Sequence, residues 1–349
     1  MKIKTSKAAI LTQSREPLVV DEIELPDALE VGQVLVKVLH TTICGAQINE
    51  IDAVKGPDRF LPHLLGHEAS ATVVETGPGV TTVEPGDTVV MHWRPSAGIQ
   101  GSTPAYRWRD KKLNAGWVTT FNDHAVVAEN RVTPISADYD LKVAPLLGCA
   151  VTTAVGVINN DAKVKIGESV IVFGAGGVGL NLVQFAKLVA AHPIVAVDLF
   201  DGKLEMAKRL GATHCINSSN VADLPAEIRK IVGDKGADKV LETTGNKSVI
   251  ELAYELTHAD GACVLVGVPT EKVTIYTLPI HFNKVLTGSH GGDSVPDIDI
   301  PRIIRLDQAG KLSFKELITH EFALDDINAA LDVVRSGQAG RVLVSMNHA

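Results

Sequence analysis

Residues 168–200, ESVIVFGAGGVGLNLVQFAKLVAAHPIVAVDLF, constrain the fold of this chain more than any other segment. A short apolar run is followed by a glycine-rich turn, an amphipathic stretch and a second apolar run. Apolar runs without polar alternation are typical of strands that are buried on both faces of a parallel sheet. The segment therefore predicts a strand–helix–strand unit whose helix begins at the glycine turn.

The glycine turn has the spacing GxGxxG and contains Gly174, Gly176, Gly177, Val178 and Gly179. After a strand, the first glycine permits the tight turn, the second lets a pyrophosphate approach the backbone, and the third lets the helix pack on the strand. Asp198 ends the next strand about 20 residues later, where an acidic side chain binds the adenosine ribose hydroxyls. No arginine follows it directly, so we predict NAD rather than NADP.

Two basic residues are further candidates for cofactor contacts. Lys203 lies one turn into the next predicted helix, where it either flanks the ribose or is a solvated helix residue. Arg341 precedes the last predicted strand, and it either folds back on the pyrophosphate or forms a surface ion pair.

A chain of 349 residues is long for one domain, so two domains are expected. Residues 1–150 read as short strands broken by Gly and Pro, with period-two alternation at 33–43. Residues 151–288 alternate helix with buried strand, which indicates a doubly wound parallel sheet. Residues 289–349 return to the first texture. We therefore predict an α/β protein in which a dinucleotide-binding domain is inserted into a strand-rich domain.

Charge and composition exclude several classes of function. The formal net charge of -8 argues against a nucleic-acid groove, because phosphate binding requires clustered cations. No segment approaches the roughly 20 apolar residues of a membrane helix, and no signal peptide is evident. The four cysteines are too irregularly spaced for a disulfide framework. We expect a cytoplasmic protein whose partner is a small molecule.

Three residues form a candidate zinc set: Cys44, His67 and Cys149. Each alone is adequately explained as a buried thiol or a hydrogen-bonded core histidine. Together, two thiolates and one imidazole with a fourth position open match a catalytic zinc site. The third ligand lies just before the nucleotide-binding module, so metal and nicotinamide would face one cleft. Cys215 and Cys263 lie on or beside strands of that module, and we interpret them as core.

With these features the chain resembles the zinc-dependent medium-chain alcohol dehydrogenases from end to end. The resemblance rests on Cys44-Gly45, Gly66-His67-Glu68, Gly148-Cys149, the turn 174–179 with Asp198, the turns Gly77-Pro78-Gly79 and Pro85-Gly86-Asp87, and Val266-Gly267-Val268. It implies a GroES-like catalytic domain with an inserted Rossmann domain, and NAD-linked oxidation of alcohols or reduction of carbonyls. A homodimer or homotetramer is expected.

The resemblance also implies roles for individual residues. Zinc would be held by Cys44, His67 and Cys149, with Glu68 close behind the metal or swinging in as a ligand. Zinc would act as a Lewis acid on the substrate oxygen. Further cofactor contacts are implied for Thr153, Val266 and Val268.

Three departures from the family pattern stand out. Residues 92–120, where many members hold a second, structural zinc, contain no cysteine, so we predict one zinc. Ala46 and Gln47 replace the usual hydroxyl and the acid that commonly follows it, and Asn49 replaces a histidine. The proton must therefore leave by another route: Glu50, a water chain or a hydroxyl of the substrate itself.

The segment 91–117 combines basic and aromatic residues in an acidic protein. It is either a solvated loop that packs on a neighbouring subunit or a site for a polar or anionic substrate. The leading hypothesis is a zinc- and NAD-dependent dehydrogenase of a polar alcohol, such as a polyol or sugar derivative. The alternatives are a dehydrogenase of simple alcohols, a zinc-free reductase of the same fold, and a non-enzymatic dinucleotide-binding protein.

Overall fold

The computed structural model describes residues 1–346 and divides into two compact units. One unit consists of residues 1–149 together with the chain from Val295 onward, and the other of residues 150–294. We predicted boundaries after residues 150 and 288; in the structure the return to the first unit follows Ser294. The reason is local: Gly292 packs so closely on Gly156 that a Cβ on Gly156 would lie 2.1 Å from the Gly292 carbonyl oxygen. The last three residues of the predicted 289–349 segment lie outside the described residues.

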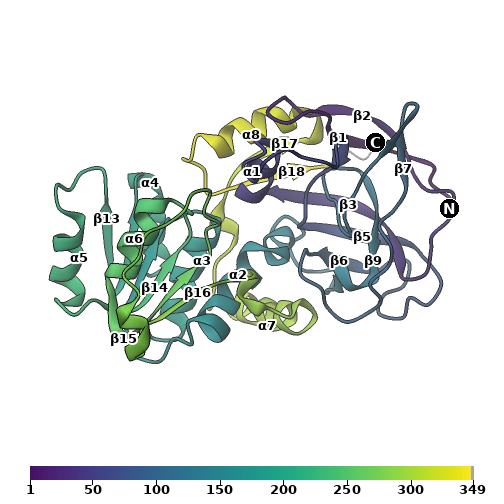
Figure 1. Cartoon of the computed structure of the whole chain (residues 1–349). Helices are drawn as coiled ribbons and strands as arrows, with labels where there is room; N and C mark the ends of the chain where they lie inside the picture. The colour runs from purple at the N-terminus through teal and green to yellow at the C-terminus, as the bar shows by residue number, and fades with distance from the viewer. Residues whose placement is uncertain (347–349) are drawn as a thin grey trace. The chain divides into compact units, whose positions relative to one another are not determined.

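The first unit contains two sheets that are mostly antiparallel (Figure 1). The smaller has the order β4-β1-β2-β7-β8, with bounds β1 Thr5–Leu11, β2 Val19–Glu24, β4 His63–Leu64, β7 Tyr106–Trp108 and β8 Lys111–Leu113. The larger has the order β10-β6-β5-β3-β18-β17 with β9 also on β3, and bounds β3 Gln33–Ile43, β5 Ala69–Thr76, β6 Thr88–Met91, β9 His124–Ala128, β10 Val132–Pro134, β17 Ile318–Ala323 and β18 Arg341–Ser345.

The long central strand β3 shows how the sequence sets this packing. Successive side chains of a strand point to opposite faces. Val34, Val36 and Val38 accordingly belong to one buried cluster. Leu35 belongs to another, together with Tyr106 and Trp108. Both faces of β3 are therefore core.

The helices of the first unit are short. They are α1 Gly45–Ile51, α7 Pro296–Gln308 and α8 Ile327–Arg335, with single turns η1 Glu129–Arg131, η2 Ala144–Gly148, η6 Lys315–Leu317 and η7 Leu324–Asp326. Within residues 1–346, no helix combines the length and the apolar character that crossing a membrane requires.

The second unit is a six-stranded parallel sheet with the order β13-β12-β11-β14-β15-β16 (Figure 1). The strands are β11 Val170–Phe173, β12 Ile194–Asp198, β13 His214–Asn217, β14 Ala237–Glu242, β15 Thr257–Leu265 and β16 Val285–Gly288. The helical segments are α2 Ala150–Gly156, η3 Val157–Asp161, α3 Gly177–Leu188, α4 Asp201–Leu210, α5 Leu224–Val232, α6 Lys247–Glu255, η4 Leu278–Phe282 and η5 Gly291–Asp293. This strand order is that of the doubly wound dinucleotide-binding fold, and it confirms the predicted fold class.

Part of the basic and aromatic segment is a hairpin, whereas residues 92–105 contain no strand or helix. Strands β7 and β8 form a hairpin that extends the smaller sheet, and β7 pairs with β2. Arg109 forms an ion pair with Asp21 at 3.1 Å, and the indole nitrogen of Trp108 donates to the same carboxylate at 2.8 Å. Arg107 faces Glu24 at 3.7 Å. Arg107 and Arg109 therefore already have acidic partners within the smaller sheet.

Candidate metal centre and cofactor turn

Three ligand-type side chains of the first unit converge, although they come from separate segments. Cys44 is the residue that precedes α1, His67 lies between β4 and β5, and Cys149 follows η2. Among the described residues these three form the one group whose ligand atoms all lie within 4.8 Å of one another. Cys149 is buried, and the other two are half-buried. The structure thus brings together the three residues that the sequence singled out.

Glycines beside the ligands make this convergence possible. Gly66 has φ of +90°, and a Cβ there would lie 2.2 Å from the Thr120 hydroxyl oxygen. A Cβ on Gly148 would lie 2.3 Å from the Met91 carbonyl oxygen. No larger residue fits at either position without a backbone shift. The Gly-His and Gly-Cys pairs in the sequence therefore have a steric explanation.

The electrostatics of the group fit a divalent metal. A hydrogen bond from Cys149 lowers the pKa of Cys44 well below its ordinary value, and the same contact together with burial raises the pKa of Cys149. Burial opposes protonation of His67, but the Cys44 sulfur raises the pKa of that imidazole overall. Nε2 of His67 is buried and has no hydrogen-bond partner in the described structure. Two sulfurs and one free imidazole nitrogen are a donor set that zinc prefers.

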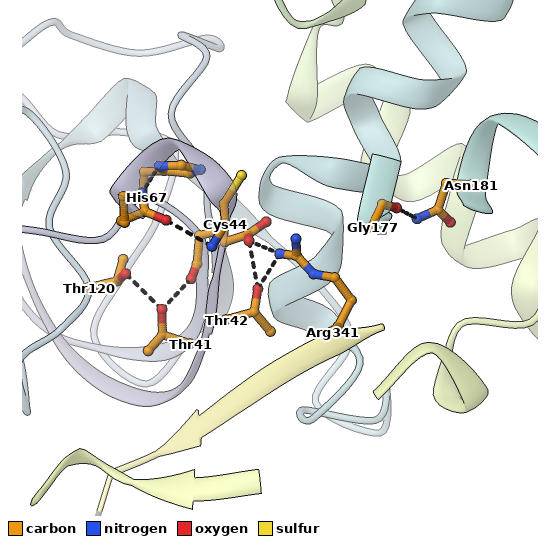
Figure 2. Close-up of polar contacts among 10 residues, drawn as sticks. Thr41, Thr42, Cys44, His67, Thr120, Gly177, Asn181 and Arg341 are labelled. Carbon is orange, nitrogen blue, oxygen red and sulfur yellow. Dashed lines mark hydrogen bonds and ion pairs between the residues drawn. The ribbon is translucent and has the colours of Figure 1, made fainter. Parts of the chain in front are cut away.

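Glu68, the residue after His67, forms a buried ion pair with Arg341. Figure 2 shows the Arg341 side chain directed toward Thr42. The Thr42 hydroxyl donates to Oε1 of Glu68 at 2.6 Å, and Nη2 of Arg341 donates both to that hydroxyl, at 2.7 Å, and to Oε1. Oε2 of Glu68 is buried and has no partner within residues 1–346, and burial raises the pKa of this carboxyl. Arg341 is 4% exposed, so the surface ion pair considered from the sequence is wrong.

Gln47 is a site residue whose role the sequence did not reveal. It is buried, its Oε1 accepts the backbone N–H of Cys44 at 2.9 Å, and its Nε2 contacts Nδ1 of His67. The side chain of the third helical residue commonly accepts a hydrogen bond from the backbone N–H of the residue that precedes the helix. That position, three residues after a ligand cysteine, was the available signal.

The glycine turn of the second unit has the geometry that its spacing predicts. Gly174 has φ of +89°, and a Cβ on Gly179 would lie 1.7 Å from the Gly174 carbonyl oxygen. A Cβ on Gly176 would meet nothing within 4 Å, so the backbone there is open to a ligand. Helix α3 begins at Gly177, and Asn181 donates back to the Gly177 carbonyl at 2.7 Å (Figure 2). This cradle fits a pyrophosphate.

Asp198 lies at the end of β12 beside this turn. Its Oδ2 accepts the N–H of Ala175 at 2.7 Å, and its Oδ1 accepts the N–H groups of Leu199 and Phe200 at 2.8 and 3.1 Å. Lys203 is in the first turn of α4, with its ammonium 5.4 Å from the centre of the Phe200 ring. Both side chains are thus located where the sequence predicted.

The other predicted cofactor contacts lie at two places in the second unit. Thr153 is buried in α2, and Val268 is 55% exposed beyond the end of β15. The N–H of Val266 donates to the Glu242 carbonyl at 2.7 Å. The Glu242 carboxylate, which the sequence pattern did not single out, accepts hydrogen bonds from the N–H groups of Thr244 and Gly245 at 2.6 and 3.1 Å and so holds the loop after β14. An acid at the end of a buried strand was the available signal.

Helix α1 carries the residues that bear on proton transfer. Ala46 and Glu50 are both exposed and lie one helical turn apart, so they share a face of this short helix. Although the Glu50 side chain reaches the surface, desolvation by the surrounding chain raises the pKa of its carboxyl. Asn49 is half-buried, and neither it nor Ala46 offers a hydroxyl or an imidazole.

Comparisons with known proteins identify the same two parts of the chain. Residues 30–137 match the model of the alcohol dehydrogenase GroES-like domain, and residues 177–306 match that of zinc-binding dehydrogenases. An S-(hydroxymethyl)glutathione dehydrogenase from Paracoccus denitrificans is 32% identical, over 97% of this chain and 99% of its own.

Solved structures of similar proteins cover nearly the whole chain. An alcohol dehydrogenase zinc-binding domain protein from Burkholderia ambifaria aligns with a TM-score of 0.90 and 28% identity, over 99% of this chain and 100% of its own. A benzyl alcohol dehydrogenase from Acinetobacter calcoaceticus aligns with a TM-score of 0.89 and 27% identity, over the same shares.

Proposed function

Because this chain belongs to the zinc-dependent medium-chain alcohol dehydrogenases, and is an NAD-dependent oxidoreductase of alcohols, we propose that its substrate is a polar alcohol or the matching carbonyl. The proposed substrate class comprises polyols and sugar derivatives. The observation that carries the proposal is the surface of α1, which presents Ala46 where the family usually has a hydroxyl.

Cys44, His67 and Cys149 would hold the catalytic zinc through two sulfurs and Nε2 of the imidazole. Zinc bound there supplies Lewis-acid chemistry at the substrate oxygen. Glu68 keeps Oε2 free beside this group, while Thr42 and Arg341 hold its other oxygen. Glu68 would therefore adjust the charge around the metal or join it as a ligand.

The proton of the alcohol needs an acceptor that α1 does not supply at Ala46. Glu50 lies one turn after Ala46 on the same face of α1, and it is the titratable side chain of this helix. A substrate with a second hydroxyl would bridge the distance to Glu50 or to water. A simple alcohol cannot, and this difference favours polar substrates.

NAD would bind the second unit through the open backbone at Gly176 and the start of α3. The remaining contacts of the set would come from Gly174, Gly177, Val178, Gly179, Thr153, Lys203, Val266, Val268 and, for the pyrophosphate, Arg341. Asp198 would accept hydrogen bonds from the ribose hydroxyls in place of those that it now accepts from backbone N–H groups. The carboxylate would repel a 2′-phosphate, which favours NAD over NADP.

A substrate screen tests the proposal most simply. NADH formation should be followed with matched pairs of simple alcohols, vicinal diols and sugar alcohols. We expect higher kcat/KM for substrates that carry a second hydroxyl. The relatives bear names for both a polar and an aromatic substrate, S-(hydroxymethyl)glutathione and benzyl alcohol. A clear preference for an apolar alcohol such as benzyl alcohol would reject the proposal.

A second copy of the chain is the partner that we propose for the edge of the parallel sheet. Strand β16 is at one end of the strand order. Its first residue, Val285, is 47% exposed, and Tyr276 and Phe282, which precede the strand, are 69% and 66% exposed. An apolar edge strand is a template for pairing with another chain. Light scattering should show a homo-oligomer that Phe282→Glu weakens; a monomeric parent protein would contradict this.

The cytoplasm is the compartment that we propose. None of the four cysteines forms a disulfide within residues 1–346, and Cys44 and Cys149 must stay reduced to bind a metal. Fractionation of the source cells would test this, and recovery from an oxidising compartment would contradict it.

A further inference from the structure

We propose that Gln47 positions two of the ligands of the metal site. We also propose that one hydrogen bond is lost when zinc binds, because Gln47 has a single acceptor oxygen. The inference rests on the proposed zinc site, but it concerns a residue outside the ligand set. Gln47 is the third residue of α1 and only 2% exposed, so its amide cannot turn to solvent.

The amide of Gln47 is shared between two of the proposed ligands. Its Oε1 accepts the N–H of Cys44 at 2.9 Å, and its Nε2 contacts Nδ1 of His67. An amide nitrogen only donates, so Nδ1 of His67 accepts in this arrangement. The proton of the neutral ring then lies on Nε2, the atom that has no partner among the described residues.

Metal binding through Nε2 reverses that arrangement. A neutral imidazole that coordinates through one nitrogen carries its proton on the other and donates it. The loaded site therefore presents two donors to Gln47: the Nδ1–H of His67 and the backbone N–H of Cys44. Gln47 has one acceptor atom within reach of them, and whichever way its amide is turned, one donor faces the NH₂ group.

A carboxylate at this position would remove the conflict, because each of its oxygens accepts one of the two donors. The glutamine therefore binds zinc less tightly than a glutamate would in the same place. It also leaves the imidazole without an anionic partner, so the metal keeps more of its positive charge.

The test is the zinc dissociation constant, measured by competition with a chromophoric chelator on the full-length chain. We expect Gln47→Glu to bind zinc about 10-fold or more tightly than the parent, since such outer partners are typically worth 10–100-fold in metal affinity. Gln47→Met, which has no amide acceptor, should bind zinc about 10-fold more weakly.

Gln33→Glu is the matched control. Gln33 is also 2% exposed in the same unit, and it also spans two backbone groups, the Glu30 N–H at 2.8 Å and the Ser102 carbonyl at 3.0 Å. This variant makes the same chemical change away from the ligands, so its zinc affinity should equal that of the parent.

The outcomes separate this inference from the proposed function. A folded parent protein that binds no zinc would reject the proposed site itself. A zinc-binding parent with equal or weaker affinity in Gln47→Glu would overturn the role of Gln47 alone. Should that variant not fold, Gln47→Met decides: weaker binding supports the inference, and unchanged binding overturns it.

Discussion

Glu68 and Arg341 form an ion pair in which neither side chain is more than 5% exposed, although 273 residues separate them in sequence. The pair joins the residue after a proposed zinc ligand to the first residue of β18, and so ties the metal group to the last strand of the described chain. Thr42 completes the arrangement by bonding both partners. Removing one charge would leave the other buried without compensation.

We therefore predict that Arg341→Met destabilises the protein by about 3–5 kcal/mol, the usual cost of breaking a buried pair. Adding Glu68→Gln to that variant should restore part of the loss, because the stranded carboxylate disappears. Urea unfolding of the parent, both single variants and the double variant would measure the coupling. A strictly additive cycle would show that the two charges do not interact.

Asp198→Ala should weaken NAD binding and relax the preference over NADP. The carboxylate is held at the end of β12 by backbone N–H groups, where ribose hydroxyls would replace them. Binding titrations with both cofactors give the comparison. A parent protein that already favours NADP would contradict the assigned role of Asp198.

Ala46→Ser should raise the turnover of a simple alcohol more than that of a diol. The new hydroxyl would relay the proton for a substrate that brings none of its own, and a positioned group is worth about 10²–10⁴-fold. The quantity to compare is the ratio of kcat/KM for ethanol and a vicinal diol, before and after the change. Equal gains for both substrates would remove the link between Ala46 and substrate choice.

His92 should make stability depend on pH below neutrality. Complete burial lowers the pKa of His92 to about 4, while its Nδ1 faces the Arg94 carbonyl at 2.8 Å. The unfolded chain binds the proton at the ordinary pKa, so stability is lost as pH falls from about 6.5 to about 4. The loss between pH 7 and pH 5 should be about 2 kcal/mol.

The check on His92 is urea unfolding of the parent and His92→Gln at both pH values. The glutamine amide keeps a donor and an acceptor but does not titrate. The difference between the two proteins in how the free energy of unfolding depends on pH therefore reports the contribution of His92. Identical pH slopes in the two proteins would show that His92 does not titrate between the folded and unfolded states.

Local patterns predicted much of the fold because they report backbone geometry directly. The strand 33–43, the turn at Gly174 and the strand end at Asp198 all lie where spacing and alternation placed them. The three ligand-type residues were also found from sequence, since each stands beside a glycine or at a strand end.

Contacts between distant segments could not be predicted in the same way. The burial of Arg341 depends on β18 pairing beside β3, which brings it to Thr42 and Glu68. The basic residues near Arg109 looked like a binding loop because the sequence does not show that β7 pairs with β2 and its acids. The two contacts of Gln47 likewise require the folded position of His67.

We predict that each chain holds a single zinc ion through Cys44, His67 and Cys149. The most direct measurement is the zinc content per chain of the parent and of His67→Ala, after dialysis against metal-free buffer. We expect one zinc per parent chain and essentially none in the variant. Two zinc ions per parent chain, or a variant that retains its metal while folded, would contradict it.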